Sequence, residues 1–266
     1  MITIKDLLKA EFIKGKLGYV YVLSILIPIF ISLFTFWSFS ALYNYNPDSG
    51  VNPWVLIFGL SFRLIPFIYS LFSIYIVQDN LNRDYKNNLY DIMSTFPVKK
   101  SHFHLSKIIF ISSILFFSIL LTFLITITGI NIFEFKMSEI NGFYEYGDSI
   151  FFIYLYSYFR LFLYALVIVL IQLNINRFSR NPVTNLVIPI GLSFISFVFS
   201  SMKKFTFFPY VYIHTIYNSI DVNGEITNFH IDILALIIST FLIFLYIKWI
   251  KNIKDKSLQR MYESIN

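Results

Sequence analysis

The sequence predicts an all-α polytopic membrane protein with six transmembrane helices and both termini in the cytoplasm. Of its 266 residues, 57% are hydrophobic and only 14% are charged, whereas about 25% of the residues of a soluble domain are charged. The apolar residues form blocks long enough to cross a bilayer. Lysine and arginine gather in every second connection between those blocks. This composition excludes an ordinary soluble globule, a disordered chain and a coiled coil.

Six apolar blocks are the predicted spans, within one membrane domain at 19–250. A helix rises about 1.5 Å per residue, so blocks of these lengths cross the ~30 Å hydrocarbon layer. Helices satisfy the backbone polar groups inside each block, and no block alternates as a barrel strand does. The blocks are 19–42, 53–77, 106–132, 150–175, 183–200 and 232–250.

The distribution of positive charge predicts the orientation. Sixteen Lys and Arg residues lie in 1–18, 78–107, 176–182 and from 248 onward, whereas three lie in the other connections. Positively charged loops stay on the cytoplasmic side of a membrane. We therefore expect a multi-pass protein of the cell membrane with both termini inside, ending in a basic cytoplasmic tail at 251–266.

Residues 1–18 are predicted to form an amphipathic helix at the membrane interface. Ile4, Leu7, Leu8 and Phe12 recur at helical spacing, with lysines on the other faces, and a basic helix of this kind lies in the interface. The alternative is a solvated leader with a chance apolar stripe. The first apolar block is longer than the core of a signal peptide, so we expect it to remain as a span.

The cytoplasmic connection 78–105 is predicted to contain a second amphipathic helix that ends before Pro97, because proline cannot continue a helix. A basic segment then leads into the third span. Such a helix suits the docking of a soluble partner, and the alternative is a plain connector. One face of the helix carries Leu81, Tyr85, Leu89 and Ile92.

This connection resembles the cytoplasmic loop of ABC-2 type transporter permeases, which typically reads Glu-Arg-Glu-x-Gly-Thr…Leu-Leu-x-x-Pro-Val-x-Arg…Lys. Lys86, Asn88 and Leu89 depart from that pattern, where Glu, Gly and Thr are usual. The matching positions are Asp84 for the first acid, Ile92 and Met93 for the apolar pair, Pro97-Val98, Lys100 for the Arg, and Lys107 for the last Lys.

The resemblance extends to the architecture. The family has six spans with both termini inside, an N-terminal amphipathic helix, and a long outer loop with an aromatic-Pro segment, which 207–216 resembles. Size and composition are most similar to the small permeases of lantibiotic or peptide-antibiotic immunity and peptide-export systems. The resemblance thus implies that the chain is a transport subunit whose cargo is an amphipathic or antimicrobial peptide.

In this family the loop between spans two and three is the coupling helix, which docks on an ATP-binding subunit. The chain lacks the Gly-x-x-x-x-Gly-Lys-[Ser/Thr] phosphate loop, so ATP and magnesium are expected on the partner and no cofactor in this chain. The resemblance assigns coupling to Asp84, Leu89, Ile92, Met93, Pro97, Lys99 and Lys100.

Two arginines, Arg63 and Arg160, lie inside predicted spans. An ionisable residue in a span is costly and marks a functional site by default. The two guanidinium groups are expected at similar depth, where they would line a transport pathway and receive a carboxylate or phosphate. The alternative is that each has a structural role, and the nearest acids to pair with are loop-end residues such as Asp232.

The sequence therefore favours a permease subunit of an ATP-driven exporter rather than an enzyme. Its expected partners are a cytoplasmic ATP-binding subunit, a second copy or a related permease, membrane lipid and a peptide or other hydrophobic substrate, but not nucleic acid. No metal-binding or hydrolase motif is present. The alternatives are an ATPase-independent membrane enzyme and a non-transporting scaffold or sensor subunit.

Overall fold

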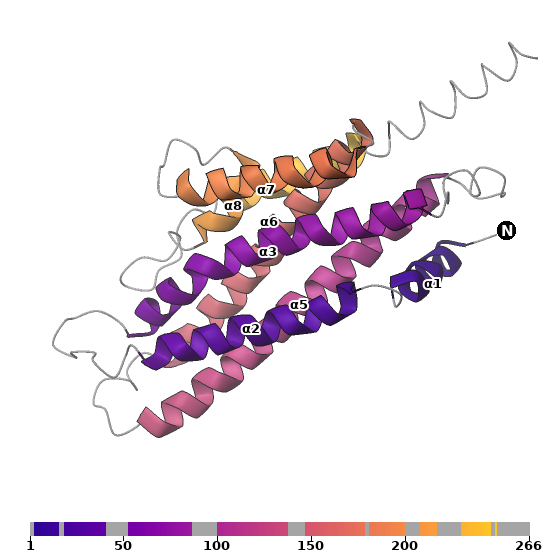
Figure 1. The fold of residues 1–266 in the computed structure, drawn as a ribbon. Coiled ribbons are helices and arrows are strands. Elements are labelled where there is room, and N and C mark those ends of the chain that lie inside the picture. Colours follow the sequence, from indigo (N-terminus) through magenta and orange to yellow (C-terminus); the bar gives the residue numbers. More distant parts are fainter. Residues whose placement is uncertain are drawn as a thin grey trace, which may run out of the picture.

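Every element in the described part of the chain is a helix. The computed structural model describes residues 3–15, 19–40, 53–86, 100–137, 147–178, 181–199, 208–216, 230–245 and 248. The helices are α1 (Ile4–Gly15), α2 (Val20–Ser40), α3 (Pro53–Lys86), α5 (Lys100–Met137), α6 (Gly147–Phe178), α7 (Pro182–Phe199), α8 (Pro209–Thr215) and the helix His230–Leu245. In Figure 1 the long helices lie side by side as a bundle, with α1 at one end of it.

The predicted apolar blocks form the long helices of this bundle. Four of them, α2, α3, α5 and α6, contain a stretch long and apolar enough to cross a membrane. Two shorter apolar helices, α7 and His230–Leu245, coincide with the fifth and sixth predicted blocks. The all-helical, multi-pass fold class is confirmed, while the count of six spans and the orientation of the termini stay predictions.

The outer surface of the bundle is apolar, as a lipid-facing surface must be. Large side chains such as Phe30, Trp37, Phe152 and Val198 are largely exposed, and Trp37 is 70% exposed. Monomeric soluble proteins rarely expose a continuous apolar surface of this kind. Burial therefore separates helix faces that pack on other helices from faces left for lipid or for another protein chain.

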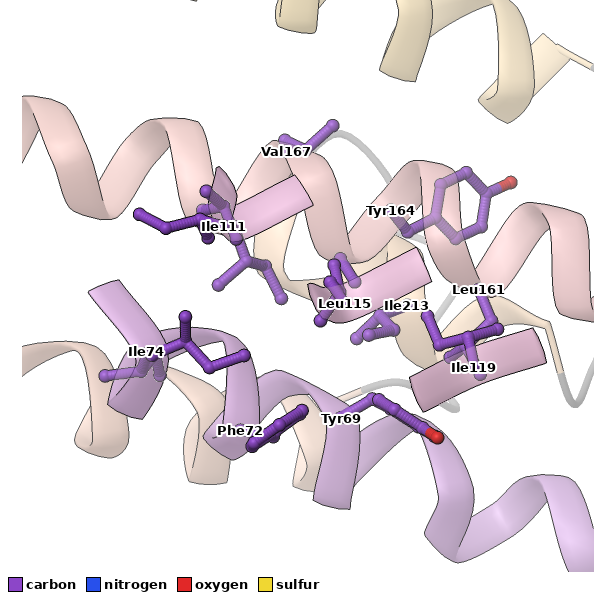
Figure 2. Packing of buried hydrophobic residues seen from close by; sticks show 14 of the residues in the cluster. Tyr69, Phe72, Ile74, Ile111, Leu115, Ile119, Leu161, Tyr164, Val167 and Ile213 are labelled. Carbon is purple, nitrogen blue, oxygen red and sulfur yellow. The ribbon is translucent and has the colours of Figure 1, made fainter. Parts of the chain in front are cut away.

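The core lies where α3, α5 and α6 meet, with α8 packed against α3 and α6 (Figure 2). Interhelical hydrogen bonds add to this packing. The Tyr69 hydroxyl donates to the carbonyl oxygen of Ser118 at 3.0 Å, which joins α3 to α5. The Tyr158 and Thr126 hydroxyls lie 3.1 Å apart and join α6 to α5. The hydrophobic effect does not drive helices together in lipid, so hydrogen bonds between small polar groups help to hold α3, α5 and α6 together.

Helix α3 continues beyond the predicted end of its apolar block at 77 and reaches Lys86. The predicted connection 78–105 is therefore helical at both described ends, because α5 already begins at Lys100. Hydropathy predicts where a chain leaves the hydrocarbon layer, whereas a helix ends only where its backbone hydrogen bonds end. Residues 78–86 contain no Pro or Gly to stop them.

The aromatic-Pro segment singled out from the sequence forms α8, and its first residue, Phe207, lies outside the described residues. Pro209 occupies the start of the helix, where its missing N–H costs nothing. The residues from Tyr210 to Thr215 are all buried. This short helix packs among α3, α6 and α7, so it is a part of the helix bundle.

Gly129 lets α2 and α5 approach closely. A Cβ atom added to Gly129 would lie 1.7 Å from Cε1 of Phe36 on α2, closer than any real contact. Gly191 on α7 differs, because no atom lies within 4 Å of the place where its Cβ would be. The ring of Phe36 therefore occupies the space that the missing side chain of Gly129 leaves.

Gly129→Ala is expected to destabilise the protein by about 1 kcal/mol, at the low end of the cost of overpacking, because the exposed ring of Phe36 must move aside for the added methyl group. Gly191→Ala is the matched control and should keep or slightly raise stability, because alanine is the better helix former. Thermal unfolding of the purified protein in detergent micelles measures both. Adding Phe36→Ala to Gly129→Ala should recover part of the loss. Equal midpoints for the two glycine variants would contradict the close approach of α2 and α5.

Candidate functional site

Helix α1 packs on the bundle through its apolar stripe. It contacts α5, where the ring of Phe12 meets the ring of Phe110 edge to face at 5.1 Å between centroids. Leu7 is buried in the same face. The hydroxyl of Tyr21 on α2 donates to the carbonyl oxygen of Phe12 at 3.1 Å. The stripe predicted to lie in the lipid interface thus packs on the protein, with Leu7 buried and Leu8 and Phe12 partly buried.

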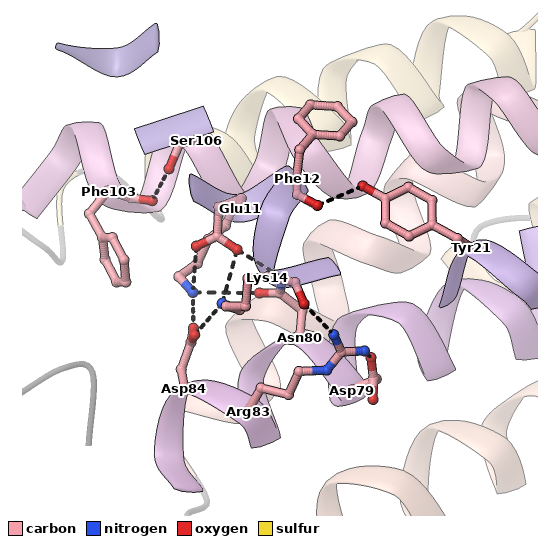
Figure 3. Close-up of polar contacts among 11 residues, drawn as sticks. Glu11, Phe12, Lys14, Tyr21, Asp79, Asn80, Arg83, Asp84, Phe103 and Ser106 are labelled. Carbon is pink, nitrogen blue, oxygen red and sulfur yellow. Dashed lines mark hydrogen bonds and ion pairs between the residues drawn. The ribbon is translucent and has the colours of Figure 1, made fainter. Parts of the chain in front are cut away.

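Four charged side chains meet where α1, α3 and α5 come together: Glu11, Lys14, Asp84 and Lys107, hereafter the charge cluster (Figure 3). Lys14 Nζ lies 2.9 Å from Glu11 Oε2, and Lys107 Nζ lies 3.4 Å from Glu11 Oε1. Both ammonium groups also form ion pairs with the carboxylate of Asp84. Two acids and two bases therefore alternate around one site.

The charge cluster is almost completely removed from solvent. The side chains of Asp84 and Lys107 are fully buried, and that of Glu11 is 5% exposed. The Asn80 amide adds a hydrogen bond, donating to Glu11 Oε2 at 3.1 Å. Buried charges are tolerated only when paired and hydrogen-bonded, and here the four formal charges cancel. Loss of any one of them would leave a buried charge uncompensated.

The electrostatics of Glu11 show how this pairing offsets burial. Burial by itself would raise the pKa of the Glu11 carboxyl, because a low-dielectric site disfavours the charged form. The ammonium groups of Lys107 and Lys14, together with the amide of Asn80, outweigh this effect and hold the pKa of Glu11 below its usual value. Glu11 is therefore ionised at neutral pH, as its role in the charge cluster requires.

Arg83 ties the end of α1 to α3 beside the charge cluster. Its guanidinium donates to the carbonyl oxygen of Lys14 at 2.9 Å and forms an ion pair with Asp79 one turn earlier on α3. A carbonyl in the last turn of a helix lacks an intrahelical donor, so Arg83 supplies one. These contacts fix the direction in which α1 leaves the bundle.

The charge cluster takes residues from both sides of the segment 87–99: Asp84 precedes the segment and Lys107 follows it. Asp84 is two residues before the end of α3, and Lys107 is seven residues after the start of α5. Asp84 is thus the one predicted coupling residue whose side chain the structure describes, and it faces α1 and α5 rather than solvent. Lys100 starts α5, but its side chain is not described. The other coupling residues, Leu89, Ile92, Met93, Pro97 and Lys99, lie outside the described residues.

The structure does not pair the two arginines predicted to share a pathway. Arg160 on α6 is 2% exposed, and its Nε donates to Asp232 Oδ1 at 2.8 Å. Asp232, on the helix His230–Leu245, also accepts hydrogen bonds from the hydroxyls of Tyr156 and Tyr164. Arg160 therefore joins two helices through an ion pair between its buried guanidinium and the partly exposed carboxylate of Asp232, which agrees with its structural alternative.

Arg63 on α3 has an exposed side chain and makes no ion pair or hydrogen bond in the part of the chain that the structure describes. Among the described residues no three His, Asp or Glu side chains gather closely enough to hold a metal ion.

Sequence reasoning missed Glu11 and Lys14, although one signal was present. Glu11 lies one turn after Leu7, inside the apolar stripe of α1, and Asp84 lies one turn after Leu81, inside the apolar face of α3. An acid within an apolar stripe indicates a buried carboxylate that needs a base. Which base it meets depends on tertiary contacts between positions about 70 residues apart, such as Lys14 and Asp84.

Lys107→Met is expected to lower the free energy of unfolding by about 3–5 kcal/mol, because two carboxylates then share one base in a buried site. Adding Asp84→Leu should recover most of this loss, since the remaining pair of Glu11 and Lys14 is neutral. Lys9→Met removes an exposed lysine of α1 and should change stability by less than about 0.5 kcal/mol. Chemical denaturation in micelles measures all three, and additive losses in the double variant would contradict the pairing.

Asp232→Asn is expected to destabilise the protein by about 3 kcal/mol, because it leaves the buried guanidinium of Arg160 without its counter-charge. Arg63→Gln, which removes an exposed cation, should cost less than about 0.5 kcal/mol. Thermal midpoints of both variants in the same detergent compare the two. If Arg63→Gln unfolded as early as Asp232→Asn, Arg63 would have a structural role like that of Arg160.

Comparison with known proteins identifies the family of the chain. A family model described as ABC-2 family transporter protein matches residues 7–200, from α1 to the end of α7. No curated protein and no solved structure matches the chain. The match covers well over half of the chain and includes the described residues around the charge cluster. The chain therefore belongs to the ABC-2 family of transporter proteins: it is a membrane permease of an ABC transporter, a transport subunit rather than an enzyme.

Proposed function

We propose that this permease is the membrane half of an ATP-driven exporter and that the segment 87–99 couples it to a soluble ATP-binding subunit. The charge cluster is the observation that carries this proposal. It fastens α1, α3 and α5 together at both ends of the segment, so a force on the segment acts on three helices at once. A plain connector between two spans has no need of four buried charges.

In this proposal the residues of the segment divide into two roles. Leu89, Ile92, Met93 and Pro97 form the apolar surface that enters the ATP-binding subunit, and Lys99 and Lys100 contact acidic groups beside it. Asp84 does not touch the partner. It is a positioning residue, because its buried carboxylate holds the end of α3 against Lys107 and Lys14. ATP and magnesium bind on the partner.

The transport cycle follows from this division of roles. Nucleotide-driven closure of two ATP-binding subunits pulls two permeases toward each other, either two copies of this chain or this chain and a related permease. Because the charge cluster keeps α1, α3 and α5 together at that end, the helices tilt as a unit rather than fray. The pathway between the permeases then alternates in access.

We propose an amphipathic or antimicrobial peptide as the cargo and the cell membrane as the location, with both termini in the cytoplasm. The similarity of size and composition to small immunity and peptide-export permeases supports this cargo. The positive charge on one side of the predicted spans supports the orientation. An exporter of this kind would remove the peptide from the membrane before it accumulates there.

The test is capture of the tagged permease from native membranes and identification of what accompanies it. Ile92→Asp with Met93→Asp, and Lys99→Glu with Lys100→Glu, are expected to remove an ATP-binding protein that the unaltered chain retains. Lys248→Glu is the matched control, because it reverses an exposed lysine outside the segment and should leave the complex intact. Substitutions are preferable to deleting 81–92, which would also remove Asp84 and the charge cluster.

Two results would contradict the proposal. One is that the unaltered chain retains no protein with a phosphate-binding loop under several mild detergents. The other is that the variants at 92–93 and 99–100 retain as much ATP-binding protein as Lys248→Glu does. Thermal midpoints near that of the unaltered chain would show that the variants are folded.

A further inference from the structure

Helix α8 contains two polar side chains that are buried without a hydrogen-bond partner. Tyr210 is 2% exposed and its hydroxyl has no hydrogen bond. His214 is 4% exposed and neither ring nitrogen has one. The two residues lie one turn apart, so they share a face of the helix. The hydroxyl of Ser193 on α7 is a third buried group without a hydrogen bond.

The surroundings of His214 are aromatic. Its ring lies 6.3 Å from the ring of Phe67 on α3 and 5.6 Å from the ring of Phe197 on α7, measured between centroids. A buried polar group without a partner costs about 1–3 kcal/mol. A phenylalanine would fill such an aromatic site without this cost, so the presence of an imidazole here needs an explanation.

The exposed Arg63 lies on the side of α3 that carries Phe67. Arg63 precedes Phe67 by four residues, and residues at this spacing are neighbours on a helix surface. The contact between Phe67 and His214 therefore brings α8 next to the part of α3 that carries a cation without a partner among the described residues. Arg160 cannot serve in its place, because Asp232 already neutralises it.

We propose that Arg63, Tyr210 and His214 form a binding site for the anionic group of an amphipathic molecule, a carboxylate or a phosphate. All three side chains can donate hydrogen bonds, and a carboxylate or a phosphate has enough acceptor positions to receive three donors. Arginine binds both groups in a forked geometry. The apolar part of the molecule would pack on Phe67 and Phe197. This inference rests on the proposed function, since it names the chemistry that the transport pathway recognises.

The test measures binding to the permease alone, so that it does not depend on any ATP-binding subunit. The probe is 11-(dansylamino)undecanoic acid, added to the protein in phosphatidylcholine nanodiscs, with its neutral methyl ester as a comparison. Empty nanodiscs give the background. A second arm uses fluorescent phosphatidylglycerol in the nanodisc, which distinguishes a lipid headgroup from a free carboxylate.

We expect Arg63→Gln and Tyr210→Phe each to weaken binding of the acid about tenfold or more, the value of a hydrogen bond to a charged group. Lys9→Gln, which removes an exposed cation on α1, should leave binding unchanged. Tyr210→Phe and His214→Phe should at the same time keep or raise the thermal midpoint, because each removes an unpartnered buried polar group. A purely structural role for these residues would produce the opposite pattern.

The inference would be overturned if the unaltered protein bound the neutral ester as tightly as the acid. It would also be overturned if neither arm showed binding above empty nanodiscs, or if the Arg63 and Tyr210 variants bound the acid as the unaltered protein does. Such a failure would leave the capture of the ATP-binding subunit unaffected, and a failed capture would leave anion binding unaffected. The two proposals are therefore tested separately.

Discussion

The fold depends on the pairing of Asp84 with Lys107, two opposite charges that are fully buried where α3 and α5 approach each other. Each of these charges would be costly without its partners, so their pairing favours one lateral position of the two helices. Lys14 and Glu11 extend the same alternation to α1. The helix before the first span is thereby built into the bundle and held there by electrostatics as well as by the contact of Phe12 with Phe110.

Most of the costly polar groups described so far are paired with groups of opposite charge or with hydrogen-bond partners. At one end, four charges neutralise one another. In the middle, the hydroxyls of Tyr69 and Tyr158 reach neighbouring helices, and Arg160 meets Asp232. Around α8 this pairing is missing, since Tyr210 and His214 have no hydrogen-bond partner. Other buried atoms without a hydrogen bond, such as Ser193 Oγ, Gln172 Oε1 and Asn176 Oδ1, lie on α6 and α7, whereas Tyr210 and His214 share one face of the short helix α8.

The hydropathy pattern located the long helices, but some of the predicted blocks end before the helices do. The predicted block 183–200 agrees with α7 to within a residue at each end. The block 53–77 falls nine residues short of the end of α3 at Lys86, because a helix that leaves the lipid becomes polar without ceasing to be a helix. Tertiary pairing was not accessible from the sequence: Arg160 and Asp232 are 72 positions apart, and one sequence does not show which helices are neighbours.

The charge cluster also sets an order of events during synthesis. Glu11 and Lys14 are made first, Asp84 follows, and Lys107 comes last, so a nascent chain that ends before residue 107 carries two acids and one base. The charges of α1 therefore have their full set of partners only once the start of α5 has been made. The cluster can thus be complete before α6 and the helices after it are made, and a chain interrupted before residue 107 leaves the carboxylates of Glu11 and Asp84 with one base between them.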